Sequence, residues 1–154
     1  MYNVEWNTQS VKDFVSASFD NYILQWDIKD KKEAVTKYEF SENTHIREVK
    51  FSPFNPHHLA AQSSTKLEII DIRQPAKPFW SYEINDSELN GNGVEWDPKN
   101  QDRIASAISK KILIFDLKER GKEPLDELAH YSLIKSFHWM RSKENHFSIL
   151  GESP

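Results

Sequence analysis

The sequence contains no cysteine and only four glycines among its 154 residues. Without cysteine it cannot form disulfides, use a thiolate in catalysis or bind zinc through thiolates, and this fits an intracellular, cytoplasmic protein. No apolar run approaches the roughly 20 residues that span a membrane. The first residues lack the basic and apolar segments of a signal peptide. We therefore expect a soluble chain with no transmembrane segment.

The sequence also lacks a basic block: 20 lysines and arginines stand against 24 acidic residues, which gives a formal net charge of −4. A general phosphate-backbone binder usually carries a basic face, so nucleic acid is disfavoured as the main partner. Glycine-rich phosphate loops, the nucleophile elbow and the metalloprotease helix motif are missing as well. We predict a protein that is not an enzyme, with no cofactor and no catalytic or metal-binding residues.

Aromatic residues, by contrast, make up 12% of the chain, and β-branched residues are frequent. Both kinds of side chain suit a pleated, half-buried surface. Many short runs alternate apolar and polar residues, whereas no window keeps a 3.6-residue apolar period over the length of a helix. The pattern predicts an all-β fold.

An internal repeat organises the chain. Four short segments each contain an aromatic anchor, and the anchors are spaced 45, 45 and 43 residues apart. Three further segments end in an apolar residue followed by aspartate, and these aspartates are spaced 44 and 45 residues apart. Because the anchors and the aspartates recur at the same spacing, they indicate repeated structural units. The anchors are Trp6, Phe51, Trp96 and Trp139, and the aspartates are Asp27, Asp71 and Asp116.

Each unit holds at least three short strands: one with the anchor, one rich in alanine and serine, and one that ends in the aspartate. A fourth strand fits the spacers at 34–40 and 78–84. Four strands in a repeat of about 40–45 residues are typical of a β-propeller blade. We therefore predict one partial propeller domain over 1–154, with about three and a third four-stranded blades. The repeat units cover about 1–45, 46–90, 91–133 and 134–154, the last one incomplete.

The first unit resembles the WD-repeat family, and the spacing extends this resemblance over essentially the whole chain. Residues 16–27 match the pattern SxSxDxxIxxWD. The resemblance implies a buried network of the Trp, a strand Ser, the turn Asp and an upstream His, since a buried indole N–H and a buried carboxylate need partners. The expected network residues are Ser16, Ser18, Asp20, Trp26 and Asp27, with His130 in the fourth unit.

The second and third units depart from this pattern. Ser64 and Ser109 stand where the first unit has the turn Asp, and Ile70 and Phe115 stand where it has the Trp. We expect these two blades to be held together by apolar packing alone.

The family's closed rings usually hold about seven blades, roughly twice what this chain supplies. Two sources of the remaining blades stay open. The chain is a fragment of a longer parent chain, or several chains complete one ring. An open stack exposes apolar blade faces and strand edges, which favours association.

Loops carried on a rigid scaffold are good sites for function. The resemblance places the starts of the first strands and the second-to-third turns at the narrow end of a propeller, where partners often bind. The exposed aromatic residues at 79–82 are an alternative anchor. His57 and His58 are interpreted as structural, because adjacent strand residues point apart. The partner-binding candidates are Asn43, His45, Arg47, Ser87 and Asn90, with Asn21, Thr65 and Lys110 nearby.

The predicted function is a non-catalytic scaffold that binds other proteins or peptides as part of a multiprotein complex. The segments IREVKFSP (46–53) and DIRQP (71–75) resemble WD-repeat subunits of the SEA/GATOR nutrient-signalling complexes. That resemblance implies sister subunits as partners, a lysosomal or vacuolar surface as the location, and control of the amino-acid-sensitive growth kinase as the output.

Two alternative functions remain open. Residues 71–73 match the last part of the W-D-x-R motif with which some WD-repeat proteins dock on a cullin-ring ligase adaptor, so Arg73 is a further candidate contact. The chain would then be a substrate receptor of a ubiquitin ligase. The less favoured alternative is an enzyme with its active site in the propeller channel.

Overall fold

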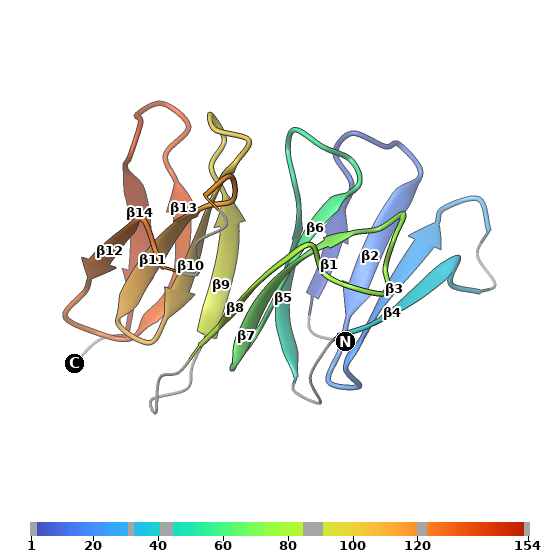
Figure 1. The fold of residues 1–154 in the computed structure, drawn as a ribbon, viewed down its shortest axis with the longest axis horizontal. Coiled ribbons are helices and arrows are strands. Elements are labelled where there is room, and N and C mark those ends of the chain that lie inside the picture. The colour runs from blue at the N-terminus through green and yellow to red at the C-terminus, as the bar shows by residue number, and fades with distance from the viewer. Residues whose placement is uncertain (1–2, 31–32, 41–44, 85–90, 120–122, 153–154) are drawn as a thin grey trace.

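The computed structural model describes residues 3–30, 33–40, 45–84, 91–119 and 123–152. Their strands form four antiparallel sheets that follow one another along the chain (Figure 1). Sheet 1 contains β1 (Asn3–Trp6), β2 (Asp13–Ala17), β3 (Tyr22–Asp27) and β4 (Thr36–Glu39). Sheet 2 contains β5 (Ile46–Phe51), β6 (His58–Ser63), β7 (Lys66–Asp71) and β8 (Trp80–Glu83). Sheet 3 contains β9 (Gly91–Trp96), β10 (Arg103–Ile108), β11 (Lys111–Asp116) and β12 (Asp126–Ala129), and sheet 4 contains β13 (Ile134–Trp139) and β14 (Phe147–Gly151).

The strands pair in chain order, so the first three sheets are four-stranded meanders and sheet 4 is a hairpin. The inner strands β1, β5, β9 and β13 each contact the next, and the later strands of each sheet lie farther out (Figure 1). This is the arrangement of propeller blades, and it confirms the predicted all-β partial propeller. A membrane-crossing helix, which needs both length and apolar composition, is not found among the described residues.

The rear face of a sheet is the face on the side of the preceding sheet, and its front face is on the side of the following sheet. The packed contact between two consecutive sheets is called a joint. Strand alternation assigns side chains to the two faces. In β5, Val49 and Phe51 pack to the rear with Val15 and Ala17 of sheet 1. The joint between sheets 2 and 3 contains Ala60, Leu67, Ile69, Val94, Trp96, Ile104 and Phe115. The joint between sheets 3 and 4 contains Ala105, Ala107, Ile112, Ile114, Ile134, Phe137 and Trp139.

The repeated aspartates cap turns. In each case Oδ1 of the aspartate accepts a hydrogen bond from the backbone N–H of the residue two positions later. The distances are 2.8 Å for Asp27, 3.0 Å for Asp71 and 2.9 Å for Asp116. This side-chain contact closes the turn to the outer strand, as in an Asx turn. The aspartates keep their spacing because each blade needs the same turn at the same point.

The expectation that sheets 2 and 3 are joined by packing alone is wrong. The side chain of Gln62 is fully buried in this joint. Its Nε2 donates to the carbonyl oxygen of Ala107 at 3.2 Å, and its Oε1 accepts from Oγ of Ser106 at 3.1 Å. A buried amide requires such partners, and Gln62 finds both of them across the joint.

Candidate functional site

The indole of Trp26 is held by one hydrogen bond and one ring stack. Its Nε1 donates to Oγ of Ser16 on β2 at 2.9 Å. The Trp26 ring stacks on Phe14 with centroids 6.1 Å apart, and Phe14 stacks on Trp6 with centroids 5.8 Å apart. The three rings form a row across the rear face of sheet 1.

The other network candidates lie in local contacts of their own. Asp20 is exposed, and its Oδ1 accepts the backbone N–H of Tyr22 at 3.3 Å. Nδ1 of His130 lies 3.0 Å from the carbonyl oxygen of Ser132. The contacts of the described residues therefore bring Ser16 and Trp26 together, whereas Asp20, Asp27 and His130 each make a local contact of their own. Ser18 lies partly buried directly after β2.

Five of the partner-binding candidates in the loops are described. His45, Arg47 and Lys110 are exposed, Thr65 is partly buried, and Asn21 is buried. The His45 ring meets Phe19 edge-on with centroids 4.5 Å apart, and its Nδ1 lies 2.9 Å from the carbonyl oxygen of Phe19. This contact ties the start of sheet 2 to the β2–β3 turn of sheet 1. Asn43, Ser87 and Asn90 lie outside the described residues.

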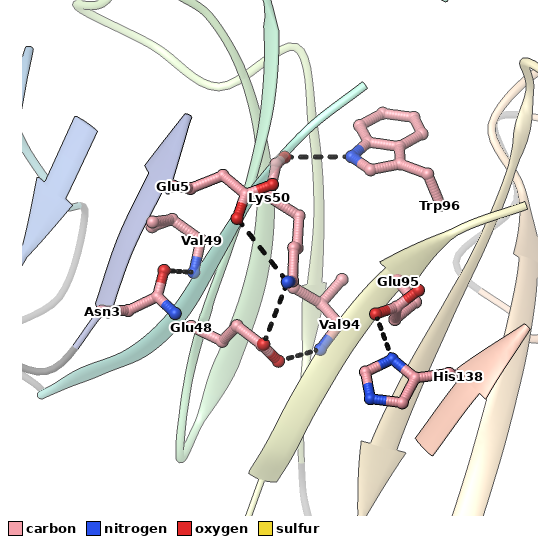
Figure 2. Close-up of polar contacts among 9 residues, drawn as sticks. All are labelled: Asn3, Glu5, Glu48, Val49, Lys50, Val94, Glu95, Trp96 and His138. Atoms are coloured by element: carbon pink, nitrogen blue, oxygen red, sulfur yellow. Dashed lines mark hydrogen bonds and ion pairs between the residues drawn. The ribbon is translucent and has the colours of Figure 1, made fainter. Parts of the chain in front are cut away.

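A row of polar side chains, called the polar ladder below, runs across the inner strands (Figure 2). Its members are Asn3, Glu5, Glu48, Lys50, Glu95 and His138. Nζ of Lys50 lies 3.6 Å from Oε2 of Glu5 and 3.7 Å from Oε1 of Glu48. Burial raises the pKa of both carboxyl groups, and Lys50 offsets part of that effect. Burial by itself would lower the pKa of Lys50, but the two carboxylates outweigh it and raise this pKa. The three half-buried groups thus form one coupled cluster.

Side chains of the ladder also satisfy backbone groups of the next sheet. Oε2 of Glu48 accepts the N–H of Val94 at 2.9 Å, and Oδ1 of Asn3 accepts the N–H of Val49 at 3.4 Å (Figure 2). Asn3 and Glu48 hold equivalent positions in β1 and β5, so the same contact recurs at two consecutive joints. This contact therefore fixes β1 to β5 and β5 to β9 in register.

The anchor tryptophans add a second contact at these joints. Nε1 of Trp96 donates to the carbonyl oxygen of Lys50 at 3.0 Å, and Nε1 of Trp139 donates to that of Glu95 at 3.4 Å. Oε1 of Glu95 also lies 2.8 Å from Nδ1 of His138. A buried indole N–H usually finds an acceptor, and here the preceding inner strand supplies it.

A groove of about 690 Å³ lies along the ends of the inner strands. Its floor includes Phe51, Trp96 and Trp139, which belong to the apolar joints. The groove therefore offers an apolar floor together with charges of both signs. Its charged lining residues are Glu5, Lys50, Glu95, Lys99 and Arg141.

Arg73 is engaged by its neighbour Asp71. Its Nε and Nη2 donate to Oδ1 and Oδ2 of Asp71 at 3.0 and 2.6 Å. These hydrogen bonds hold the pKa of Asp71 at about 2. The Arg73 side chain is still 59% exposed. With Lys12 and His57 it lines a hollow of about 640 Å³ between sheets 1 and 2.

The expected exposed cluster of aromatic residues at 79–82 is wrong in part. Trp80 and Tyr82 pack on Phe115 of sheet 3, with centroids 5.2 and 4.7 Å away. Phe79 is half exposed and contacts the ring of His58. Within the described part of the chain, no three metal-ligating side chains come together.

The polar ladder was not predicted, although the repeat contains a signal for it. The residue before each anchor is charged or titratable, and these residues share the anchor spacing of 45, 45 and 43. Neighbouring strands that present opposite charges at equivalent positions favour ion pairs. The four residues are Glu5, Lys50, Glu95 and His138.

Three known proteins resemble the chain over most of its length. A WD repeat-containing protein of Dictyostelium discoideum is 26% identical over 142 residues, which cover 92% of this chain. Maintenance of telomere capping protein 5 of Saccharomyces cerevisiae is 30% identical over 148 residues, which also cover 92%. A DDB1- and CUL4-associated factor 7 homolog of Dictyostelium discoideum is 26% identical over 142 residues, which cover 88%.

The chain spans only part of these relatives. It covers 8% of the Dictyostelium WD repeat-containing protein, 12% of the yeast protein and 43% of the DDB1- and CUL4-associated factor 7 homolog. No family model matches the chain.

Proposed function

Because the chain is part of a WD-repeat β-propeller, we propose that it serves as a non-catalytic interaction scaffold in a multiprotein complex. Its partners are other proteins or peptides, and nucleic acid is not the main one. In a parent protein as long as the relatives above, further blades of the same polypeptide complete the propeller. The setting is intracellular and cytoplasmic.

The repeated joint between inner strands carries this proposal. Consecutive sheets are tied by hydrogen bonds at equivalent positions, and the groove of about 690 Å³ lies across the same strands. A groove and loops fixed in this way lose little freedom on binding, which favours affinity for a partner. The exposed cations Lys99 and Arg141 at its rim suit an extended peptide that carries an acidic residue.

Co-purification of the tagged protein from its own cells tests the scaffold role. Charge reversal at the groove, with Lys99→Glu and Arg141→Glu together, is expected to release a defined set of partner subunits. Lys29→Glu is the matched control, since Lys29 is an exposed cation in the β3–β4 turn away from the groove. Unchanged partners in the folded groove variant would contradict the groove as the binding surface.

We further propose a nutrient-signalling complex at the lysosomal or vacuolar surface as the setting. The support is the resemblance of the segments 46–53 and 71–75 to subunits of the SEA/GATOR complexes. Reciprocal co-purification with regulators of the growth kinase, from fed and amino-acid-starved cells, is the test. Absence of association in both conditions would remove this setting and leave the general scaffold role standing.

One observation favours a second function, that of a substrate receptor for a cullin-ring ubiquitin ligase. The chain resembles a protein named as a DDB1- and CUL4-associated factor homolog, and Arg73 follows Asp71 at motif spacing with an exposed guanidinium. Arg73→Glu should then abolish pull-down of the ligase adaptor. Unchanged pull-down would remove this candidate.

A positive hydrolase screen on the parent protein would instead favour an enzyme with a channel active site.

A further inference from the structure

The hollow of about 640 Å³ between sheets 1 and 2 is separate from the groove of about 690 Å³, because the two share no lining residue. Its walls come from two consecutive sheets of the chain. Sheet 1 contributes the β1–β2 turn and the start of β2, and sheet 2 contributes the β5–β6 turn and the residues directly after β7. The hollow therefore lies across the joint between these sheets.

Hydrogen bonds across this joint hold the walls in place. Asn7 is 2% exposed, and its Nδ2 donates to the carbonyl oxygen of Pro56 at 3.1 Å. The hydroxyl of Tyr38 lies 2.6 Å from Oε1 of Gln25 and 3.2 Å from the carbonyl oxygen of Ile72. A ligand would therefore meet a hollow that is already formed, and binding would cost little ordering of the protein.

Cationic groups with unused N–H donors line the hollow. Arg73 uses Nε and Nη2 to hold Asp71, which leaves the two N–H groups of Nη1 for a ligand. Lys12 and His57 also line the hollow, and neither forms an ion pair with the described residues. The lysine ammonium supplies three donors, and an imidazole ring supplies at least one N–H in either charge state.

The acceptors in the lining are fewer and are already engaged. Asp13 is the one carboxylate among the described lining residues, and its Oδ2 accepts the hydroxyl of Ser10 at 2.8 Å. Oε1 of Gln25 is engaged by the hydroxyl of Tyr38, so Nε2 of this amide remains as a donor. Two cations, a histidine and an amide donor thus accompany a single carboxylate, and this balance favours an anionic ligand.

A phosphate group suits these donors better than a carboxylate does. A phosphorylated side chain carries nearly two negative charges at neutral pH and three acceptor oxygens. Lys12 belongs to sheet 1, whereas His57 and Arg73 belong to sheet 2. One group with several acceptor oxygens can bond donors from both walls, and guanidinium and ammonium groups are the usual phosphate ligands in proteins.

Apolar side chains beside these donors favour a peptide over a free anion. Val11, Pro56 and Ile72 line the same hollow, and Val11 is 85% exposed. An apolar residue next to a phosphorylated one would cover this surface and remove it from water. The volume of about 640 Å³ also lies within the usual range of ligand sites, about 300–1,000 Å³.

We propose that this hollow binds a phosphorylated serine or threonine of a partner protein, with an apolar residue next to it in the bound segment. Lys12, His57 and Arg73 hold the phosphate, and Val11 and Ile72 contact the apolar side chain. The inference is independent of the functions proposed above, because Lys12 and His57 belong neither to the groove nor to the ligase-adaptor motif.

NMR titration of the 154-residue chain with the peptide acetyl-Leu-phosphoserine-Leu-amide tests this inference. The backbone signals of Lys12, His57 and Arg73 should shift and reach saturation. The unphosphorylated serine peptide should leave them unchanged. Inorganic phosphate should bind several-fold more weakly than the phosphopeptide, because it lacks the apolar contacts.

Variants then identify the groups that hold the phosphate. Lys12→Ala should weaken binding of the phosphopeptide about tenfold, as loss of a hydrogen bond to a charged group does. Addition of His57→Ala should weaken it further. Lys37→Ala is the matched control and should bind like the wild type, since Lys37 is an exposed lysine on β4 of the same sheet and does not line the hollow. Circular dichroism verifies that each variant is folded, and Lys12→Ala alone decides if the double variant unfolds.

The absence of a saturable shift in the wild type would overturn the proposal, as would equal binding of the serine peptide. Unchanged affinity in folded Lys12→Ala would exclude the predicted phosphate contacts. Equal affinity for inorganic phosphate would overturn the assignment of a peptide ligand. Lys12-dependent binding to vesicles that contain phosphatidylinositol 4-phosphate, tighter than binding of the phosphopeptide, would overturn it in favour of a lipid headgroup.

Discussion

Single residues explain why the repeat keeps its spacing while its residue types change. In sheet 1 the indole N–H of Trp26 requires an acceptor, and Ser16 on the neighbouring strand provides it. In sheet 2 the equivalent pair is Ile70 and Ala61, so the donor and the acceptor are lost together. A polar pair can disappear as a unit, because neither half is then left buried without a partner.

The first prediction concerns this pair. Trp26→Phe and Ser16→Ala should each lower the free energy of unfolding by about 0.5–1.5 kcal/mol, since each removes the same hydrogen bond and Phe keeps the stack on Phe14. The double variant should cost less than the sum of the two. Urea denaturation of the four proteins gives this coupling. If the losses in unfolding free energy of the two single variants simply added up in the double variant, the hydrogen bond between Trp26 and Ser16 would contribute nothing to stability.

The second prediction concerns the pH dependence of Glu48. Burial raises the pKa of its carboxyl group above the ordinary value of 4.5, so the folded state binds this proton more tightly than the unfolded state. The resulting stabilisation is complete below pH 4.5 and is lost as the pH rises through the raised pKa. Glu48→Gln keeps an acceptor for Val94 and removes the titration. The stability of the variant should thus fall less steeply from pH 4.5 to neutrality in urea denaturation; an equal slope in both proteins would refute this.

The third prediction concerns Asp71 and its guanidinium partner. The lowered pKa of about 2 contributes stability above the ordinary value of 3.8, and this stability is lost as the pH falls through about 2. Arg73→Ala should return the pKa of Asp71 toward 3.8, as measured by NMR titration of its carboxyl carbon. Lys118→Ala serves as the control and should leave Asp71 unchanged. An unaltered Asp71 in Arg73→Ala would mean that the ion pair does not persist in solution.

Strands and turns were the part of the molecule that the sequence predicted best. Alternation and period depend on local pattern, so the anchor strands, the strands rich in alanine and serine, the strands that end in Asp27 and Asp71 and the second-to-third turns could all be predicted. The contacts of Gln62 and of Lys50 could not, because they depend on how one sheet sits on the next. The spacing of Glu5, Lys50 and Glu95 was visible, but only the packed joint shows which groups meet.

The fourth prediction concerns the joint between sheets 2 and 3. Gly93 has a φ of +152°, and a Cβ at this position would lie 2.6 Å from Oε2 of Glu48. Gly93→Ala should therefore displace the carboxylate from Val94 and lower the free energy of unfolding by about 1–3 kcal/mol. Glu48→Ala in the same chain should recover the steric part of that loss. A thermal melt unchanged by Gly93→Ala would contradict the close approach.

At the scale of the whole molecule, the chain is a row of blades joined through its inner strands. The repeat and the family resemblance predicted the partial propeller, since both report the order of strands along the chain. They did not predict the polar ladder that crosses the joints. The ladder accompanies one rule of contact that holds at successive joints, in which Trp96 and Trp139 each donate a hydrogen bond to the inner strand before them.

Hydrogen exchange of the tryptophan indole groups, followed by NMR, tests this rule most directly. The five tryptophans give separate Nε1–H signals. Trp96 and Trp139, whose N–H groups are buried in joints, should exchange slowly, whereas Trp6, which is 42% exposed, should exchange fast. If Trp96 and Trp139 exchanged as fast as Trp6 in the dilute chain, the stacked joints would not exist in solution.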